Sequence, residues 1–437
     1  MSSVRNRLGH ALRIFGTDGG RVSLPRLQPK SHLRAFLAVL PLIAYRGLAG
    51  GMPVLLGLLI AYRWGLTELA AFTVANAMIA VAVIVTDWGA TRALPRNLAL
   101  LPPGAAVEML GSANTFRLLI VAVIVVAATV AVAIGFVDRA VAEYLALLFP
   151  LCPLSVVATN AVGERVVAGQ TRAVGTAAAL GIVVFGVLAA AVVAAGLGPR
   201  SLVAAFVAGK VLEALVLVSK RWWVMALSSR SVRSTALAFW PFSSQMILGI
   251  LYSRMAVFTV EQMTTREELG VFSVATALNS ALLLIPVSMA LLHFPELTRR
   301  TREGDVAGVR RIIIRYSITS TAGVALGLLC LLMAAGPLSD GLDVPRESAA
   351  FVLTFAAIAF VSSVNAILGF LMQARGQEAL AARLSVVTLS LAIVYQVAAL
   401  SAWGLWGIVP AVAGAELTSV IVFGSALLRR RRVTERL

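Results

Sequence analysis

Charged residues are scarce in this chain. They make up 13% of its 437 residues, whereas hydrophobic residues make up 59%, and soluble domains carry roughly 25% charged residues. The mean hydropathy is +0.92. A water-soluble core cannot hide this much apolar surface, so the composition excludes an ordinary soluble domain. It predicts instead that lipid surrounds much of the chain.

Residues that form disulfides or bind metals are also rare. The chain has two cysteines and three histidines. Cys152 and Cys330 lie inside apolar stretches, so we expect small buried side chains rather than a disulfide or a metal site. The sequence shows no glycine-rich phosphate-binding loop and no nucleophile elbow. We therefore expect no enzymatic activity and no cofactor.

Apolar stretches long enough to cross a bilayer follow one another along the chain. A hydrocarbon core about 30 Å thick needs roughly 20 apolar residues per helix. We therefore predict an all-α polytopic membrane protein with about twelve transmembrane helices. The stretches are 33–61, 66–86, 115–137, 140–161, 173–196, 201–219, 234–260, 269–294, 312–336, 348–372, 384–402 and 406–428.

Basic residues fall mainly into alternate gaps between these stretches. The net charge of +17 would suit nucleic-acid binding, but the basic residues form no single patch, so we expect no nucleic-acid partner. Because lysine and arginine concentrate in cytoplasmic loops, the pattern predicts a multi-pass inner-membrane protein with both termini in the cytoplasm. The predicted outer gaps hold only Arg63, Arg139, Arg200, Arg266 and Arg346.

Two predicted cytoplasmic segments matter below. Arg117 is assigned to the gap before the third helix, together with Arg92 and Arg96. The arginine-rich stretch 296–315 is predicted to be a cytoplasmic loop on the side opposite to residues 337–347. We expect its arginines to lie against the anionic headgroups of membrane lipids.

The second half of the chain repeats the first. Residues 68–77 and 268–277 share six of ten positions, and Pro41 and Pro95 meet Pro241 and Pro295 at the same offset. An Asn-Ala pair at Asn160 recurs at Asn365. Each half holds six predicted helices, an even number, so both halves have the same orientation. We therefore predict two six-helix lobes related by a pseudo-twofold axis along the membrane normal, with a site between them.

Ionisable residues inside the predicted helices are the candidates for function, because each is costly in a bilayer unless it faces protein or water. Arg46 and Arg254 lie in the first and seventh helices, which the repeat relates. Neither has a carboxylate at helical spacing. Lys210 and Glu213 are three residues apart and can pair on one helix face. Glu416 lies in the twelfth helix.

Short motifs then give the chain a resemblance to a known family. In chain order, the motifs are Thr86-Asp87-Trp88-Gly89 with Arg92, Glu268-Leu269-Gly270-Val271-Phe272-Ser273-Val274-Ala275, Phe294-Pro295-Glu296-Leu297 and Gln373-Ala374-Arg375-Gly376-Gln377. With these motifs in this order, the chain resembles the polysaccharide flippases of the multidrug/oligosaccharidyl-lipid/polysaccharide exporter superfamily over nearly its whole length after the first tail. Peptidoglycan-precursor flippases of this superfamily usually have two more helices.

This resemblance implies that a central cavity alternates between the two membrane faces and moves a polyprenyl-diphosphate-linked oligosaccharide to the outer leaflet. Arginine suits a diphosphate because its planar fork donates hydrogen bonds in pairs. We therefore predict that Arg46, Arg254 and Lys210 bind substrate, with Glu213 and Glu416 as coupling or counter-ion groups. The expected partners are the lipid-linked oligosaccharide, membrane lipids and enzymes of glycan assembly.

The expected organisation has five parts. They are a basic cytoplasmic tail (1–33), an N-terminal six-helix lobe (34–222), a cytoplasmic linker (223–233), a C-terminal six-helix lobe (234–428) and a second basic tail (429–437).

Other functions stay open at this point. A cation-coupled multidrug antiporter of the same superfamily would need a carboxylate deep in the N-terminal lobe, where the first helix carries Arg46 instead. A membrane polymerase or ligase of lipid-linked sugars would usually need a large outer loop, and the longest predicted one is only 337–347. A scaffold for glycan assembly is a further alternative.

Overall fold

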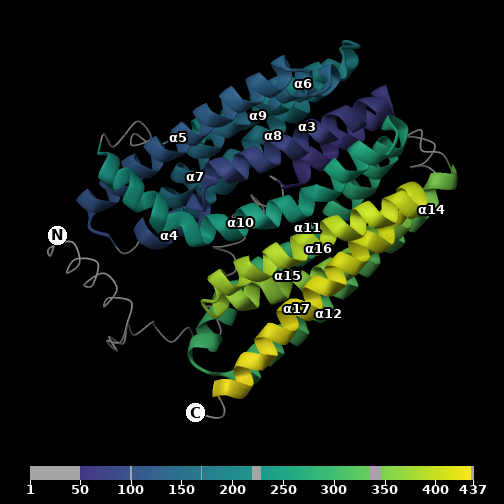
Figure 1. Ribbon diagram of the computed structural model, residues 1–437. Helices are drawn as coiled ribbons and strands as arrows, with labels where there is room; N and C mark the ends of the chain where they lie inside the picture. Colours follow the sequence, from purple (N-terminus) through teal and green to yellow (C-terminus); the bar gives the residue numbers. More distant parts are fainter. Residues whose placement is uncertain are drawn as a thin grey trace. The chain divides into compact units, whose positions relative to one another are not determined.

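The computed structural model describes residues 50–98, 101–168, 170–218, 228–334, 336 and 346–434, and every element within them is a helix (Figure 1). A helix at Gly50–Trp64 precedes the labelled elements. The N-terminal half continues with α3 (Leu66–Asp87), α4 (Ala90–Leu98), α5 (Pro103–Ala133), α6 (Arg139–Leu148), α7 (Leu151–Val167), α8 (Thr171–Ala194) and α9 (Pro199–Leu217).

The C-terminal half begins with two long helices. Its elements are α10 (Ser229–Met263), α11 (Arg266–Arg302), α12 (Val306–Met333), α14 (Arg346–Ala357), α15 (Ala359–Ala374), α16 (Glu378–Trp403), the short 3-10 helix η1 (Gly404–Gly407) and α17 (Ile408–Thr434).

The apolar lengths confirm the predicted fold class. Within the described residues, nine segments are long and apolar enough to cross a membrane, and one of them, Glu378–Leu427, contains both α16 and α17. The short Gly50–Trp64 helix and the charged α9 account for two more of the predicted stretches. Each of the twelve predicted stretches therefore coincides with helix over most of the residues that the structure describes.

The two halves repeat the same pattern of helix packing. In the first half α3 packs on α6 and α7, α5 packs on α7, and α9 packs on α7 and α8; in the second half α11, α12 and α17 pack in the same way on α14, α15 and α16. The pairs α8–α9 and α16–α17 can be followed side by side in Figure 1. The fourth helix is broken in both halves, between α6 and α7 and between α14 and α15. The predicted duplication is thus visible in the packing.

An arginine also plays the same part in each half. Arg165 near the end of α7 donates to the Leu217 carbonyl at the end of α9, at 3.4 Å. Arg375 after α15 donates to the Leu427 carbonyl in α17, also at 3.4 Å. The Leu217 carbonyl lies at a helix C-terminus, where carbonyls lack helical partners and cations are stabilising, whereas the Leu427 carbonyl lies inside α17. The sequence predicted Arg165 and Arg375 only as charges of cytoplasmic gaps, whereas the structure shows that each also contacts a helix of its own half.

The arginine-rich stretch 296–315 is not a loop, and this prediction is wrong. Helix α11 continues to Arg302 and α12 begins at Val306, so only Glu303–Asp305 form a turn. Pairs spaced by four residues extend α11, because Arg299 contacts Glu303 at 3.0 Å and Arg300 contacts Glu296 at 2.7 Å. The contact of these arginines with lipid headgroups stays a prediction. Most of the stretch 337–347, which was predicted to lie on the opposite side of the membrane, is outside the described residues.

Two further expectations need correction. Cys152 is buried as predicted, but Cys330 is exposed on α12, because an apolar helix in a bilayer presents side chains to lipid as well as to protein. The predicted linker 223–233 is partly helix, since α10 begins at Ser229, where the Ser228 side chain accepts from the Ser231 N–H. Residues 1–33 lie outside the described residues, as do 219–227 and 435–437.

Candidate functional site

Arg254 lies in the C-terminal third of α10 and is half-buried. Its Nε–H is buried and donates to no acceptor, and the side chain forms no ion pair with any residue in the described ranges. A buried N–H donor is costly to leave unsatisfied away from water. The predicted partner residue Arg46 lies outside the described residues.

The face of α10 that carries Arg254 can be identified from its neighbours. Val257 follows Arg254 by one turn and Glu261 by two turns, so the three side chains share one face. Val257 is buried, and Glu261 lines a cavity with Ala71 and Val74 of α3. Helix α10 packs directly on α3. Arg254 therefore lies on the seam between the two halves, about 10 Å along α10 from Glu261.

Lys210 and Glu213 form the pair that their spacing predicted. Lys210 Nζ lies 2.9 Å from Glu213 Oε2, and both side chains are largely buried on α9. Gly181 of α8 leaves room for them, since a Cβ there would lie 3.1 Å from the Glu213 Cβ. The pair neutralises itself, so this geometry serves helix packing and leaves no free cation at Lys210.

Glu416 belongs to a buried polar cluster in the C-terminal half. Asn365 Nδ2 of α15 donates to its carboxylate at 2.9 Å, and Ser419 donates to the Asn365 Oδ1 at 2.9 Å. Tyr252 of α10 and Ser362 of α15 also lie next to this carboxylate. The cluster joins three helices. Neither Glu213 nor Glu416 is a counter-ion of Arg254, although both were candidates for that role.

The sequence interpretation missed a second buried arginine. Arg117 is fully buried in α5, not in a cytoplasmic gap as predicted. It lies 3.4 Å from Asp87 at the end of α3 and donates at 2.9 Å to Asn160 Oδ1 of α7. It also donates to the Thr86 carbonyl at 3.1 Å. The prediction failed because the third helix begins at Pro103, twelve residues before the apolar stretch that marked it.

Polar residues inside otherwise apolar helices were the sequence signal for this cluster. Asn114 precedes Arg117 by nearly one turn, and the Asn160 Nδ2 group donates to the Asn114 Oδ1. Thr159 and Thr91 both donate to Asp87 Oδ1, at 3.2 and 2.9 Å. A buried charge is tolerated where it is paired and its remaining donors and acceptors are bonded. The signal was therefore a set of polar residues inside apolar helices.

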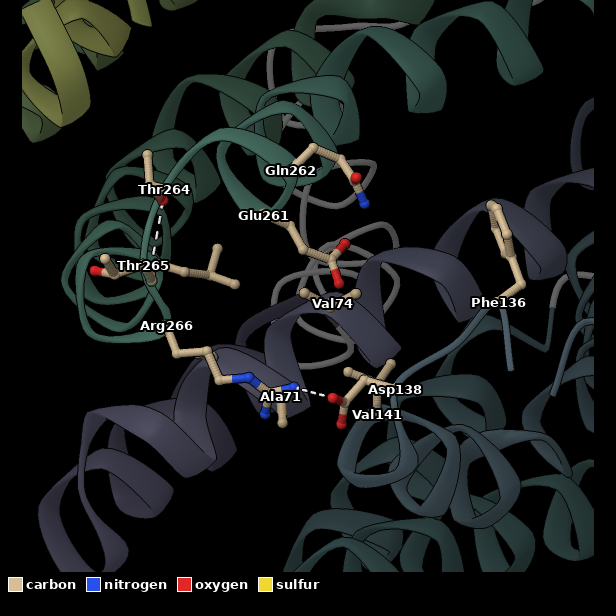
Figure 2. A pocket seen from close by; sticks show the side chains of 12 residues that line it. Ala71, Val74, Phe136, Asp138, Val141, Glu261, Gln262, Thr264, Thr265 and Arg266 are labelled. Carbon is tan, nitrogen blue, oxygen red and sulfur yellow. Dashed lines mark hydrogen bonds and ion pairs between the residues drawn. The ribbon is translucent and has the colours of Figure 1, made fainter. Parts of the chain in front are cut away.

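The halves enclose a cavity of about 250 Å³ near the turn between α10 and α11. Figure 2 shows Arg266 reaching Asp138 across it, with Glu261 and Gln262 on the opposite wall. Arg266 and Asp138 are 2.6 Å apart. The Ala140 N–H bonds Asp138, and together with Arg266 it holds the pKa of that carboxyl below its usual range. This end carries the arginine-poor gaps, which the sequence predicts to be outside.

The described residues contain no group of three or more His, Cys, Asp or Glu side chains that could hold a metal ion. Among the described residues of the seam, Arg254 is a cation without an ion pair, and the carboxylate of Glu261 lies about 10 Å farther along α10. The Arg254 guanidinium can bind an anion that enters between the two halves.

Comparisons with known proteins now agree with this architecture. No family model matches the chain. It is 22% identical over 360 residues to the probable low-salt glycan biosynthesis flippase Agl15 of Haloferax volcanii, which covers 79% of this chain and 74% of Agl15.

Two solved structures share the fold. The inward-facing conformation of a multidrug resistance MATE family transporter of the MOP superfamily aligns with a TM-score of 0.69 and 15% identity, over 90% of this chain and 95% of its own. The lipid II flippase MurJ, in an inward closed conformation, aligns with a TM-score of 0.71 and 11% identity, over 89% and 87%. The chain therefore has the fold of the multidrug/oligosaccharidyl-lipid/polysaccharide exporter superfamily, as its sequence motifs predicted.

Proposed function

We propose that this protein flips a polyprenyl-diphosphate-linked oligosaccharide across the inner membrane by alternating access, for export of a cell-surface polysaccharide. The observation that carries the proposal is Arg254, whose guanidinium lies half-buried on the seam between the two halves and whose Nε–H is buried without an acceptor. A diphosphate supplies the acceptors that this side chain lacks, in the paired geometry that a guanidinium prefers. Arg46, on the repeat-related helix, is proposed as the second contact.

The relatives support this substrate class. Agl15 is named as a probable low-salt glycan biosynthesis flippase and MurJ as a lipid II flippase, so one name refers to a glycan and the other to a lipid. The MATE transporter shares the fold but is named for multidrug resistance. A cationic drug beside Arg254 would face repulsion, so this part of the seam favours an anionic headgroup. Transport without chemical change of the substrate follows from the same proposal.

The test replaces Arg254 by alanine and by lysine. Vesicles that contain the purified protein are loaded with a fluorescent polyprenyl-diphosphate oligosaccharide, and the fraction that reaches the opposite leaflet is measured over time. A hydrogen bond to a charged group contributes about 1.5–3 kcal/mol, so Arg254→Ala should slow flipping at least about tenfold. Arg254→Lys should recover part of the rate, because a lysine keeps the charge but not the fork.

The matched control is Arg233→Ala, which removes an exposed arginine from the same helix. It should flip at the rate of the unaltered protein. Flipping by Arg254→Ala at the control rate would overturn the proposed role of the arginine. Efflux of a cationic drug, with no movement of the diphosphate lipid, would favour the antiporter instead.

A further inference from the structure

Among the described residues, one ion pair and one close helix contact join the two halves at their arginine-poor ends. Arg266 at the start of α11 lies 2.6 Å from Asp138, which precedes α6 in the other half. Beside them α11 approaches α3 so closely that a Cβ on Gly270 would lie 2.6 Å from the Leu66 Cβ. In this structure the halves are therefore closed at this end.

A third charged group lies in the same cavity, within electrostatic range of Arg266 but without a direct contact to it. Glu261 of α10 is half-buried, lines the cavity with Asp138 and Arg266, and makes no hydrogen bond or ion pair with any residue that the structure describes. Figure 2 shows its carboxylate pointing into the cavity, away from Gln262. The cavity thus holds two carboxylates for a single arginine.

The connection between Glu261 and Arg266 is short and rigid. Only two residues separate α10 from α11, and the second, Thr265, forms a capping box with Glu268: the Thr265 N–H donates to the Glu268 carboxylate at 2.9 Å, and the Glu268 N–H donates back at 3.3 Å. Glu261 and Arg266 therefore move together as parts of one half. Asp138, bonded to the Ala140 N–H at 2.9 Å, moves with the other half.

We propose that Arg266 is the switch of a gate at this end: it pairs with Asp138 while the halves are closed and with Glu261 once they separate. The exchange lowers the free-energy cost of opening. Without Glu261, Arg266 would lose its ion pair with Asp138 when the halves separate and would gain no other. Both Arg266 and Asp138 are about half exposed, so the pair stabilises the closed state only modestly. A gate that must open in every transport cycle needs such a balance.

The proposal rests on the proposed transport function only in requiring that the halves move apart. The experiment measures that movement directly, without substrate. Spin labels are attached to Ile134→Cys and Met263→Cys, which are exposed residues of the two halves near the cavity. The two native cysteines are replaced by alanine, the protein is placed in lipid nanodiscs, and the distribution of label distances is recorded.

Two single variants have opposite expected effects on the open population, a double variant tests whether Arg266 is the shared partner, and a fourth variant is the control. Asp138→Asn should raise the ratio of open to closed populations by up to about fivefold, the range expected for an exposed ion pair. Glu261→Gln should lower the ratio by a similar factor. In an Arg266→Gln background the Glu261→Gln change should have no effect, because the shared partner is gone. Gly270→Ala, which opens the α3–α11 contact by steric crowding, is the control for a charge-independent shift.

Two results would overturn the exchange. One is an unchanged ratio in Glu261→Gln, which would leave Arg266 as a simple latch. The other is an effect of Glu261→Gln that persists without Arg266. The proposed function fails independently: if Arg254→Ala flips the diphosphate lipid normally while the distances respond as described, the gate stands and the substrate assignment does not.

Discussion

The two halves of the molecule share their helix packing but not the polar groups buried within it. In the N-terminal half Arg117 of α5 reaches across to α7, where it meets Asn160 and backbone carbonyls. In the C-terminal half the equivalent helices α12 and α15 are joined by a neutral contact, since the Tyr316 hydroxyl donates to the Ser363 carbonyl at 2.8 Å. An ion and a phenol thus occupy equivalent places in the packing.

The asparagines that the repeat relates have diverged in the same way. Asn160 accepts from a cation that Asp87 balances, whereas Asn365 donates to the carboxylate of Glu416, for which the described residues provide no cation. The two halves therefore keep the same helix packing with different buried polar groups, and each half satisfies its own buried charges in a different way. It also predicts that the halves respond differently when these groups are removed.

The largest effect is expected for Arg117→Ala. Removing one partner of a buried ion pair leaves Asp87 unpaired and costs about 3–5 kcal/mol. We expect most of the protein to be lost or aggregated in detergent, measured by fluorescence-detected size-exclusion chromatography after graded heating. The matched change in the other half, Tyr316→Phe, removes one hydrogen bond and should cost about 1 kcal/mol.

Equal losses for Arg117→Ala and Tyr316→Phe would contradict the comparison. A further variant sharpens it: Asp87→Asn together with Arg117→Gln removes both charges and should be more stable than Arg117→Ala alone, because no buried charge is left without a partner.

The next effect concerns a break in one half that the other lacks. Helix α3 ends at Asp87, Trp88 and Gly89 take positive φ values of 47° and 76°, and α4 follows, whereas α11 runs without a break past the equivalent position at Met289. The turn is fixed to α10, because Trp88 Nε1 donates to the Ala236 carbonyl at 3.1 Å. A Cβ on Gly89 would lie 2.7 Å from the Ser243 nitrogen.

Gly89→Ala should therefore destabilise the protein by about 1–3 kcal/mol, through backbone strain and the clash together. Gly135→Ala is the control, since Gly135 also has a positive φ, 73°, but nothing within 4 Å of its Cβ position. It should show the strain alone, about 1 kcal/mol. Melting curves of the two variants that coincide would mean that the contact with α10 contributes nothing.

The sequence predicted the helices and the repeat well, because both follow from the length and spacing of apolar stretches. It predicted the pairing of Lys210 with Glu213, since both lie on one helix. It could not predict the contacts between helices distant in sequence, such as Arg117 with Asp87 or Arg266 with Asp138. Hydropathy also misplaced helix ends, because charged residues such as Glu296–Arg302 continue helix α11 beyond the apolar residues that marked it.

A small effect is expected for Glu416→Gln. Glutamine keeps the oxygen that accepts from Asn365, and it removes a buried carboxylate for which the described residues hold no cation. We expect the unfolding temperature to change by no more than a few degrees, corresponding to less than about 1 kcal/mol. Glu416→Ala, which also removes the acceptor, should be less stable. A loss as large as that of Arg117→Ala would show that the C-terminal half depends equally on its buried charge.

The smallest effect is expected for pH at the ion pair that joins the halves. The Ala140 N–H and then Arg266 hold the pKa of Asp138 below its ordinary value of 3.8. A depressed pKa means that the pair contributes fully above that ordinary value and is lost only as the pH falls through the lower one. The charged groups that face Asp138 are Arg266 of α11 and Glu261 of α10.

Label distances measured in the Glu261→Gln background, where Asp138 is the remaining carboxylate of the cavity, should therefore stay constant from pH 8 to pH 5 and widen only below about pH 4. The Asp138→Asn variant should show no such widening, and an opening between pH 5 and pH 7 would contradict the depressed pKa.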